Sequence, residues 1–248
     1  MNIFFTIFYQ PLYNLLVFLY DVIPGADIGF AIIIVTALIK GLLFPLTFKT
    51  LKSQREMQEI QPKVNAIREQ YKDDKEKQAS ELMAVYKNHN VNPFASCLPL
   101  IVQLPIFIAL FRVLRAGLGA VDAGTLYGFV ANPGTINAVF LGFIDLAQVS
   151  IPLAILAAIA QYFQAKMTVR QRPVPAMRKE SGAMDEDMTA TMNRMMLYIM
   201  PAMTLIIGTT SLPGGIMLYW LVTTVLTIML YHIFLKDKKD VKESTVQE

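Results

Sequence analysis

The fold is decided by Gly29-Phe-Ala-Ile-Ile-Ile-Val-Thr-Ala-Leu-Ile-Lys40-Gly-Leu-Leu-Phe-Pro-Leu-Thr-Phe48, an apolar run with one charge in its middle. As a helix, this run is long enough to cross a bilayer. A charge at that depth costs about 2.5 to 3.5 kcal/mol, so it is tolerated mainly where it faces a cavity, a partner or a substrate. Lys40 therefore predicts a polar cavity within the membrane. The alternative is a lysine that snorkels, but its ammonium would have to climb roughly 12 Å to the interface.

Composition places the chain among integral membrane proteins, because 54% of its 248 residues are hydrophobic and its mean hydropathy is positive. Four further apolar runs are long enough to span, which gives five with the first. Residues 1–25 are also apolar, but polar residues interrupt them, and they lack the basic start and cleavage site of a signal peptide. We interpret them as an amphipathic helix in the outer interface, with a sixth span as the alternative.

Positive charge is concentrated in three segments. Residues 49–87 hold nine Lys and Arg, residues 166–194 hold six, and the tail from Lys236 holds four. The positive-inside rule makes these segments cytoplasmic, which predicts an outer N-terminus and a cytoplasmic C-terminus. Five spans require opposite ends, so span count and charge agree. Arg112 and Arg115 fall at the outer end of the second span, where we expect them to anchor the helix at the headgroups.

The sequence thus predicts an all-α integral membrane protein with five transmembrane helices, a cytoplasmic helical hairpin and an N-terminal interfacial amphipathic helix. The hairpin follows from two apolar stripes on either side of a charged turn, and a docking role is favoured over a mere connector. The stripes are Met57, Ile60, Val64, Ile67 and Tyr71, then Ala79, Leu82, Met83 and Tyr86. The predicted segments are an outer-face helix at 1–25, the first span at 26–48, the hairpin at 49–93, the second span at 94–117, an outer loop at 118–147, the third span at 148–168, a cytoplasmic loop at 169–193, the fourth and fifth spans at 194–212 and 213–235, and a cytoplasmic tail at 236–248.

Polar residues on three predicted spans share one depth. Counted from the cytoplasmic ends, Lys40 lies about eight residues along its span and Gln103 and Gln161 about seven along theirs, which puts each about 10 to 12 Å deep. Thr36 lies one turn above Lys40 on the same face. This predicts a hydrophilic pocket open to the cytoplasm, although for Gln103 alone a role in helix packing is an equal alternative. Tyr219-Trp220, Thr209 and Thr210 lie nearer the outer side.

No motif for catalysis or cofactor binding occurs in the chain. The single cysteine, Cys97, excludes an internal disulfide and a cysteine metal cluster, and His89 and His232 have no ligand spacing around them. Walker, His-Glu-x-x-His and Gly-x-Ser-x-Gly patterns are missing, so we expect no cofactor and no enzyme activity. The alternatives are a small-solute or anion carrier or channel, in which Lys40 binds an anion, and a non-catalytic membrane assembly scaffold.

Five stretches of the chain resemble the YidC membrane protein insertase family. They occur in the family's order within residues 25–235, and no single one would be specific. The last of them is Pro213-Gly-Gly-Ile-Met-Leu-Tyr-Trp220, and the others are residues 33–47, 61–68, 91–94 and 97–110. The resemblance implies a five-helix core, a cytoplasmic hairpin and a groove that accepts hydrophilic parts of incoming membrane proteins. It is closest to the short form of the family, without a large periplasmic domain.

The resemblance also suggests roles for individual residues. The family normally has an arginine where this chain has Lys40, so the positive charge is kept but the bidentate fork is lost. Thr36 and Trp220 match positions along the path of a substrate helix, and Gln103 matches a polar groove residue. We predict that the groove is lined by Lys40, Thr36, Gln103, Gln161, Trp220 and Tyr219.

The partners implied by the resemblance are nascent membrane proteins and membrane lipid. The lysine-rich segments 49–93 and 236–248 would suit contact with ribosomal RNA or anionic lipid, which makes the ribosome an expected partner. The Sec translocon is a further candidate. We expect a multi-pass protein of the bacterial inner (plasma) membrane.

Overall fold

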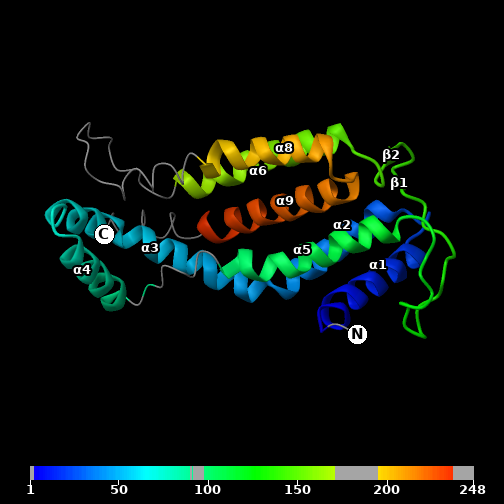
Figure 1. Ribbon diagram of the computed structural model, residues 1–248, viewed down its shortest axis with the longest axis horizontal. Coiled ribbons are helices and arrows are strands. Elements are labelled where there is room, and N and C mark those ends of the chain that lie inside the picture. The colour runs from blue at the N-terminus through cyan, green and yellow to red at the C-terminus, as the bar shows by residue number, and fades with distance from the viewer. Residues whose placement is uncertain (1–2, 90, 92–97, 171–194, 237–248) are drawn as a thin grey trace, which may run out of the picture. The chain divides into compact units, whose positions relative to one another are not determined.

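The computed structural model describes residues 3–89, 91, 98–170 and 195–236. These residues are mostly helical (Figure 1), as the sequence predicted. They divide into two units: unit 1 is Met1–Leu43, Val102–Gln164 and Pro201–Glu248, and unit 2 is Phe44–Ile101 and Ala165–Met200. Most of the predicted cytoplasmic loop and tail, together with Cys97, lies outside the described residues.

The described residues form helices in each stretch predicted as a span and in the stretch predicted as a hairpin. In chain order they are η1 (Phe5–Tyr9), a π-helical turn, α1 (Gln10–Val22), α2 (Ile28–Leu42), α3 (Phe44–Gln70), α4 (Lys75–Asn88), α5 (Leu98–Gly117), α6 (Ile151–Arg170), η3 (Met195–Ile199), a second π-helical turn, α8 (Met200–Thr210) and α9 (Gly214–Lys236). The sequence did not predict the two short strands, β1 (Val139–Phe140) and β2 (Ile144–Asp145). They pair antiparallel, with Phe140 opposite Ile144.

Among the described residues, one helix is long and apolar enough to cross a membrane by length and composition, namely α9 over Gly214–Ile233. A second span results if Ile28–Leu42 and Phe44–Thr50 are counted as one broken helix. The helical stretch Met195–Thr210 is apolar but shorter. The count of five spans therefore stays a prediction.

The predicted first span, residues 26–48, is interrupted at Leu43, where α2 has ended and α3 has not begun. Pro45 explains the break, because it has no N–H to donate to the carbonyl of Gly41 and its ring clashes with that carbonyl. Lys40 consequently lies in the last turn of α2 rather than in the middle of a helix. A helix C-terminus carries partial negative charge, so this position favours a cation.

The core of unit 1 is built where α2 packs along α9 and against α1. Its fully buried side chains include Ile32 and Val35 of α2, Leu114 of α5, and Ile216 and Met217 of α9. The outward faces are apolar as well, and the side chains that remain exposed include Ile159 of α6, Ile206 of α8 and Ile233 of α9. An extensive exposed apolar surface is unusual for a soluble monomer and suits contact with lipid.

Helix α1 packs against protein along one side, a contact that the prediction of an interfacial helix did not include. Tyr13, Leu16, Val17 and Tyr20 are buried in the core of unit 1, whereas Phe18 is exposed. The π-helical turn ends two residues before Pro11, which cannot donate the N–H that a regular α-helix would pair with the carbonyl of residue 7.

Side chains of α1 hold residues 118–147, which we call the outer segment after its predicted position. Asn14 donates from Nδ2 to the Thr125 carbonyl (3.0 Å) and accepts from the Tyr127 N–H at Oδ1 (2.6 Å). The hydroxyl oxygen of Tyr20 accepts from the Asn137 N–H (2.9 Å). The polar residues that interrupt the apolar run at 1–25 therefore position a neighbouring segment.

Asp27 joins the start of α2 to the same outer segment. Its Oδ1 accepts from the Gly29 N–H (2.7 Å), which caps the helix, and its Oδ2 accepts from the Leu141 N–H (2.9 Å) beside the two strands. One carboxylate thus fixes both the beginning of α2 and the turn between β1 and β2.

Helices α3 and α4 of unit 2 pack against each other through a small apolar cluster. Ile60, Val64 and Val91 are buried in it, with Met57 and Leu82 partly buried around them. Met83 was predicted to belong to the stripe of the second arm, but 63% of its surface is exposed. The amide of Gln78 donates to the Arg68 carbonyl across the pair (2.9 Å). The cluster is small, so α3 and α4 have few apolar contacts to hold them together.

The substitution Gly29→Ala is expected to destabilise unit 1 by about 1 to 3 kcal/mol, the usual cost of overpacking a core. A Cβ atom at Gly29 would clash with the ring of Phe140, which is buried and also packs edge-on against Phe30 (5.6 Å between centroids). Thermal unfolding in detergent measures the loss. Gly41→Ala on the same helix is the matched control, because among the described residues no atom beyond its chain neighbours and the backbone of its own helix lies within 4 Å of the added methyl group. Equal stability of both variants would contradict close packing at Gly29.

Candidate functional site

Lys40 and Thr36 lie one turn apart on α2 but differ in exposure. Thr36 is 1% exposed, and its hydroxyl donates to the Ile32 carbonyl of its own helix (2.6 Å), so it does not face an open groove in this structure. Lys40 is half-buried. Within the part of the chain that the structure describes, its ammonium forms no ion pair and no hydrogen bond. Lys40 is therefore a half-buried cation whose N–H donors have no partner among the described residues.

Gln103 and Tyr219 connect α5 to α9. The Gln103 amide donates to the hydroxyl oxygen of Tyr219, which is 3% exposed. Phe107, one turn further along α5, packs against the Tyr219 ring (6.5 Å between centroids) and edge-on against Trp220 (5.9 Å, 71°). Three of the residues predicted to line the groove, Gln103, Tyr219 and Trp220, thus belong to one aromatic and polar contact between two helices.

Gln161 and Thr204 connect α6 to α8. The Thr204 hydroxyl donates to Oε1 of Gln161 (2.5 Å), and Thr204 is buried. The sequence analysis missed Thr204 and noted only Thr209 and Thr210 on this helix, as polar residues nearer the outer side. Those two hydroxyls donate to carbonyls of their own helix. Residue spacing could have indicated Thr204: it lies four residues before Gly208, and both residues are buried on one face of α8.

The predicted site residues form two inter-helix contacts, Gln103–Tyr219 and Gln161–Thr204. No hydrogen bond among the described residues links Lys40 to either glutamine. Hydrogen bonds between membrane helices are worth about 0.6 kcal/mol on average and at most about 1.7. Both glutamines therefore contribute to helix packing, the alternative that was open for Gln103.

The described side chains give no indication of a metal site: nowhere in these ranges do three His, Cys, Asp or Glu residues gather to hold an ion. What the predicted site residues do offer is the cation of Lys40 together with several amides and hydroxyls. Such groups can compensate the loss of water around a polar peptide segment, because a buried polar group is costly only when it lacks a partner.

The sequence was compared with known protein families and curated proteins. The family described as 60Kd inner membrane protein matches residues 18–242, which include every predicted site residue. A protein of Fusobacterium nucleatum named "Membrane protein insertase YidC" is 33% identical over 210 residues, covering 85% of this chain and 87% of that protein. The chain belongs to the YidC family.

Other YidC relatives are longer than this chain. The protein of Pelobacter propionicus is 34% identical over 226 residues and that of Syntrophobacter fumaroxidans is 36% identical over 204 residues; both are named "Membrane protein insertase YidC". The matches cover 90% and 81% of this chain but only 38% and 33% of those proteins. The chain thus spans about a third of the length of these YidC proteins and most of the length of the Fusobacterium one.

Proposed function

We propose that this protein is a membrane protein insertase, which moves the hydrophilic tails of nascent membrane proteins into a positively charged groove and releases their hydrophobic segments to lipid. The observation that carries the proposal is Lys40, a half-buried cation at the end of α2 whose ammonium has no partner among the described residues. The family assignment supports the same function, since the relatives named above are called insertases.

The proposed mechanism is physical and involves no chemical reaction. An acidic or polar tail enters from the cytoplasmic side, and the ammonium of Lys40 offsets part of the cost of removing the tail from water. Amide and hydroxyl groups such as those of Gln103 and Gln161 exchange their inter-helix hydrogen bonds for bonds to the tail. Each exchange costs little, because the bonds that break are weak.

Transfer of the apolar segment into lipid drives the process in this proposal. Once the tail is in the groove, a shorter apolar distance remains to be crossed, and the following hydrophobic segment is released beside α2 and α9. The free energy comes from removing its apolar surface from water. Trp220 and Phe107 would offer that segment an aromatic surface during release.

The proposal includes the predicted topology: five spans in the bacterial inner membrane, with the N-terminus outside and the C-terminus in the cytoplasm. In this orientation α3 and α4 are cytoplasmic, and their many lysines suit contact with ribosomal RNA or anionic lipid. The ribosome and the Sec translocon are accordingly the proposed partners besides the nascent chain.

The function is tested by photocrosslinking to a ribosome-stalled, single-span nascent chain in membranes. A photoreactive residue at Trp220 is expected to crosslink to the nascent hydrophobic segment. Ile155, an exposed residue of α6, serves as the control and is expected to stay silent. Thr36 is unsuitable as a probe because it is buried. Silence at Trp220, with the protein folded and the nascent chain inserted, would favour a carrier or scaffold instead.

A further inference from the structure

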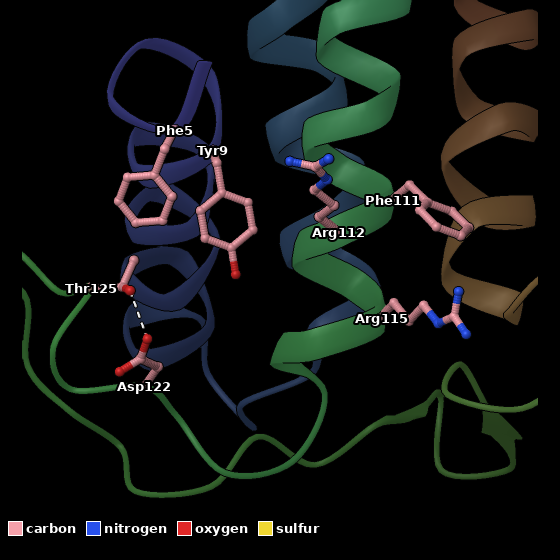
Figure 2. Close-up of a pocket in the computed structure, with 7 residues that line it drawn as sticks. All are labelled: Phe5, Tyr9, Phe111, Arg112, Arg115, Asp122 and Thr125. Atoms are coloured by element: carbon pink, nitrogen blue, oxygen red, sulfur yellow. Dashed lines mark hydrogen bonds between the residues drawn. The ribbon is translucent and has the colours of Figure 1, made fainter. Parts of the chain in front are cut away.

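Unit 1 contains a cavity of about 550 Å³ between the N-terminal helix, α5 and the start of the outer segment. Figure 2 shows its lining, which includes two arginines, Arg112 and Arg115, and the aromatic rings of Phe5, Tyr9 and Phe111. The arginines belong to the last two turns of α5, whereas Gln103 lies near its beginning. This cavity, which we call the arginine pocket, is therefore separate from the contacts described above.

The donors of both arginines are free to bind a ligand. Arg112 reaches from α5 toward α1, with its guanidinium carbon 5.2 Å from the ring centroid of Phe4, whereas Arg115 turns toward Phe111 (5.8 Å; Figure 2). Neither forms an ion pair or a hydrogen bond within the described ranges. A guanidinium that lies over a ring keeps its N–H groups in its own plane, where they can donate to an anion.

The acidic residue of the pocket, Asp122, is engaged elsewhere. Its Oδ1 accepts from the Gly124 N–H (3.0 Å) and its Oδ2 accepts from the Thr125 hydroxyl (2.7 Å; dashed in Figure 2). The carboxylate thus shapes the start of the outer segment and leaves the arginines unpaired. Two arginines and one aspartate give the lining a formal charge of +1. Arg112 and Arg115 point to opposite sides of α5 (Figure 2), so Arg112 is the cation that would face an anion beside Tyr9 and Asp122.

Tyr9 adds a neutral donor beside Arg112. Burial raises the pKa of the Tyr9 phenol, and Tyr13 and Asp122 raise it further, so the hydroxyl stays protonated at neutral pH. The ring of Phe4 lies against the Arg112 guanidinium, and the ring of Phe5 lines the pocket. An anionic group held by Arg112 would therefore have aromatic surface next to it.

We propose that the arginine pocket binds the phosphodiester headgroup of an anionic phospholipid, with Arg112 as the principal ligand and Arg115 as a supporting charge. A lipid fits better than a soluble anion because aromatic rings line the pocket and lie beside Arg112. The proposed topology places this end of α5 at the outer interface, where headgroups and aromatic side chains meet. The proposal does not depend on insertion, since a chain that handles no substrate would still bind the lipid.

Native mass spectrometry of the purified full chain in detergent tests the proposal, with phosphatidylglycerol and phosphatidylethanolamine of identical acyl chains as probes. Phosphatidylglycerol is expected to bind more tightly. Arg112→Gln is expected to weaken its binding about tenfold and Arg115→Gln about threefold, because a charge-assisted hydrogen bond is lost in the first case and a more distant charge in the second. Lys52→Gln removes one exposed charge from α3 and is expected to leave binding unchanged.

Three results would overturn the proposal: equal affinity of the wild type for both lipids, unchanged binding by Arg112→Gln, or complete displacement of the lipid by millimolar inorganic phosphate. The last result would assign the pocket to a soluble anion. Arg112→Lys keeps the charge without the planar fork and is expected to bind with intermediate affinity. Thermal unfolding of each variant identifies losses that come from misfolding, and Arg112 is exposed enough for its replacement to be tolerated.

Discussion

Replacing Lys40 by alanine is expected to slow the insertion of a membrane protein with an acidic N-terminal tail about tenfold, which corresponds to about 1.4 kcal/mol. A substrate whose tail is neutral should insert at close to the wild-type rate. The reason is that the ammonium of Lys40 is half-buried and has no partner among the described residues, so it is available to an incoming carboxylate. Two unit charges 4 Å apart attract each other by about 4 kcal/mol in an intermediate dielectric, and desolvation cancels part of this.

The measurement is the initial rate of insertion into proteoliposomes, with two substrates that differ only in tail charge. Lys40→Arg should be tolerated because it keeps the charge, and an arginine is what the family normally carries at this position. Lys52→Ala removes an exposed cation from α3 and serves as the control for net charge. If Lys40→Ala slowed both substrates equally, or neither, the electrostatic part of the proposed mechanism would be wrong.

The positions of the helices were largely predictable from hydropathy and turn residues. The predicted fifth span, 213–235, nearly coincides with α9 because Pro213, Gly214 and Gly215 mark its start clearly. Hydropathy did not predict the break at Leu43, since residues on both sides of Pro45 are equally apolar. Hydropathy also did not predict that Asn14 and Tyr13 are buried. A polar residue within an apolar helix lowers the hydropathy of that stretch, and the sequence alone does not identify its hydrogen-bonding partner. Those partners lie more than 100 residues further along the chain.

The groove residues were chosen by counting from helix ends, and this method has a clear limit. Gln103 lies near the start of α5 and Tyr219 near the start of α9, and the two helices run in opposite directions (Figure 1). Residue counting therefore assigned them different depths, yet their side chains are in contact. Counting assumes that the ends of all helices lie at the same depth. This assumption fails when helices are shifted along their axes, and long side chains can also reach partners at another depth. The sequence identified Gln103, Gln161 and Tyr219 as polar residues of interest, whereas the structure was needed to show which side chains form hydrogen bonds with each other.

The largest effect on stability is expected from Asn14→Ala, which should lower the free energy of unfolding of unit 1 by about 3 kcal/mol. Asn14 is 3% exposed and connects α1 to the outer segment through two hydrogen bonds, with a third to the Gln10 carbonyl of its own helix (2.8 Å). Alanine would leave the Tyr127 N–H without its partner, and the Thr125 carbonyl would keep only its longer hydrogen bond from Nε2 of Gln10 (3.2 Å). Each buried polar group that loses its partner costs about 1 to 3 kcal/mol.

Hydrogen exchange and thermal unfolding in detergent together separate this effect from general destabilisation. The Tyr127 amide should exchange faster in Asn14→Ala, since its N–H donates to Oδ1 of Asn14 in the wild type (2.6 Å). Asn132→Ala is the matched control within the same segment: Asn132 is exposed, and its Oδ1 accepts only a local bond from the Gly134 N–H (2.8 Å). Its cost should be about 0.5 kcal/mol or less, as for most surface substitutions. Similar losses for the two variants would mean that α1 does not hold the outer segment through Asn14.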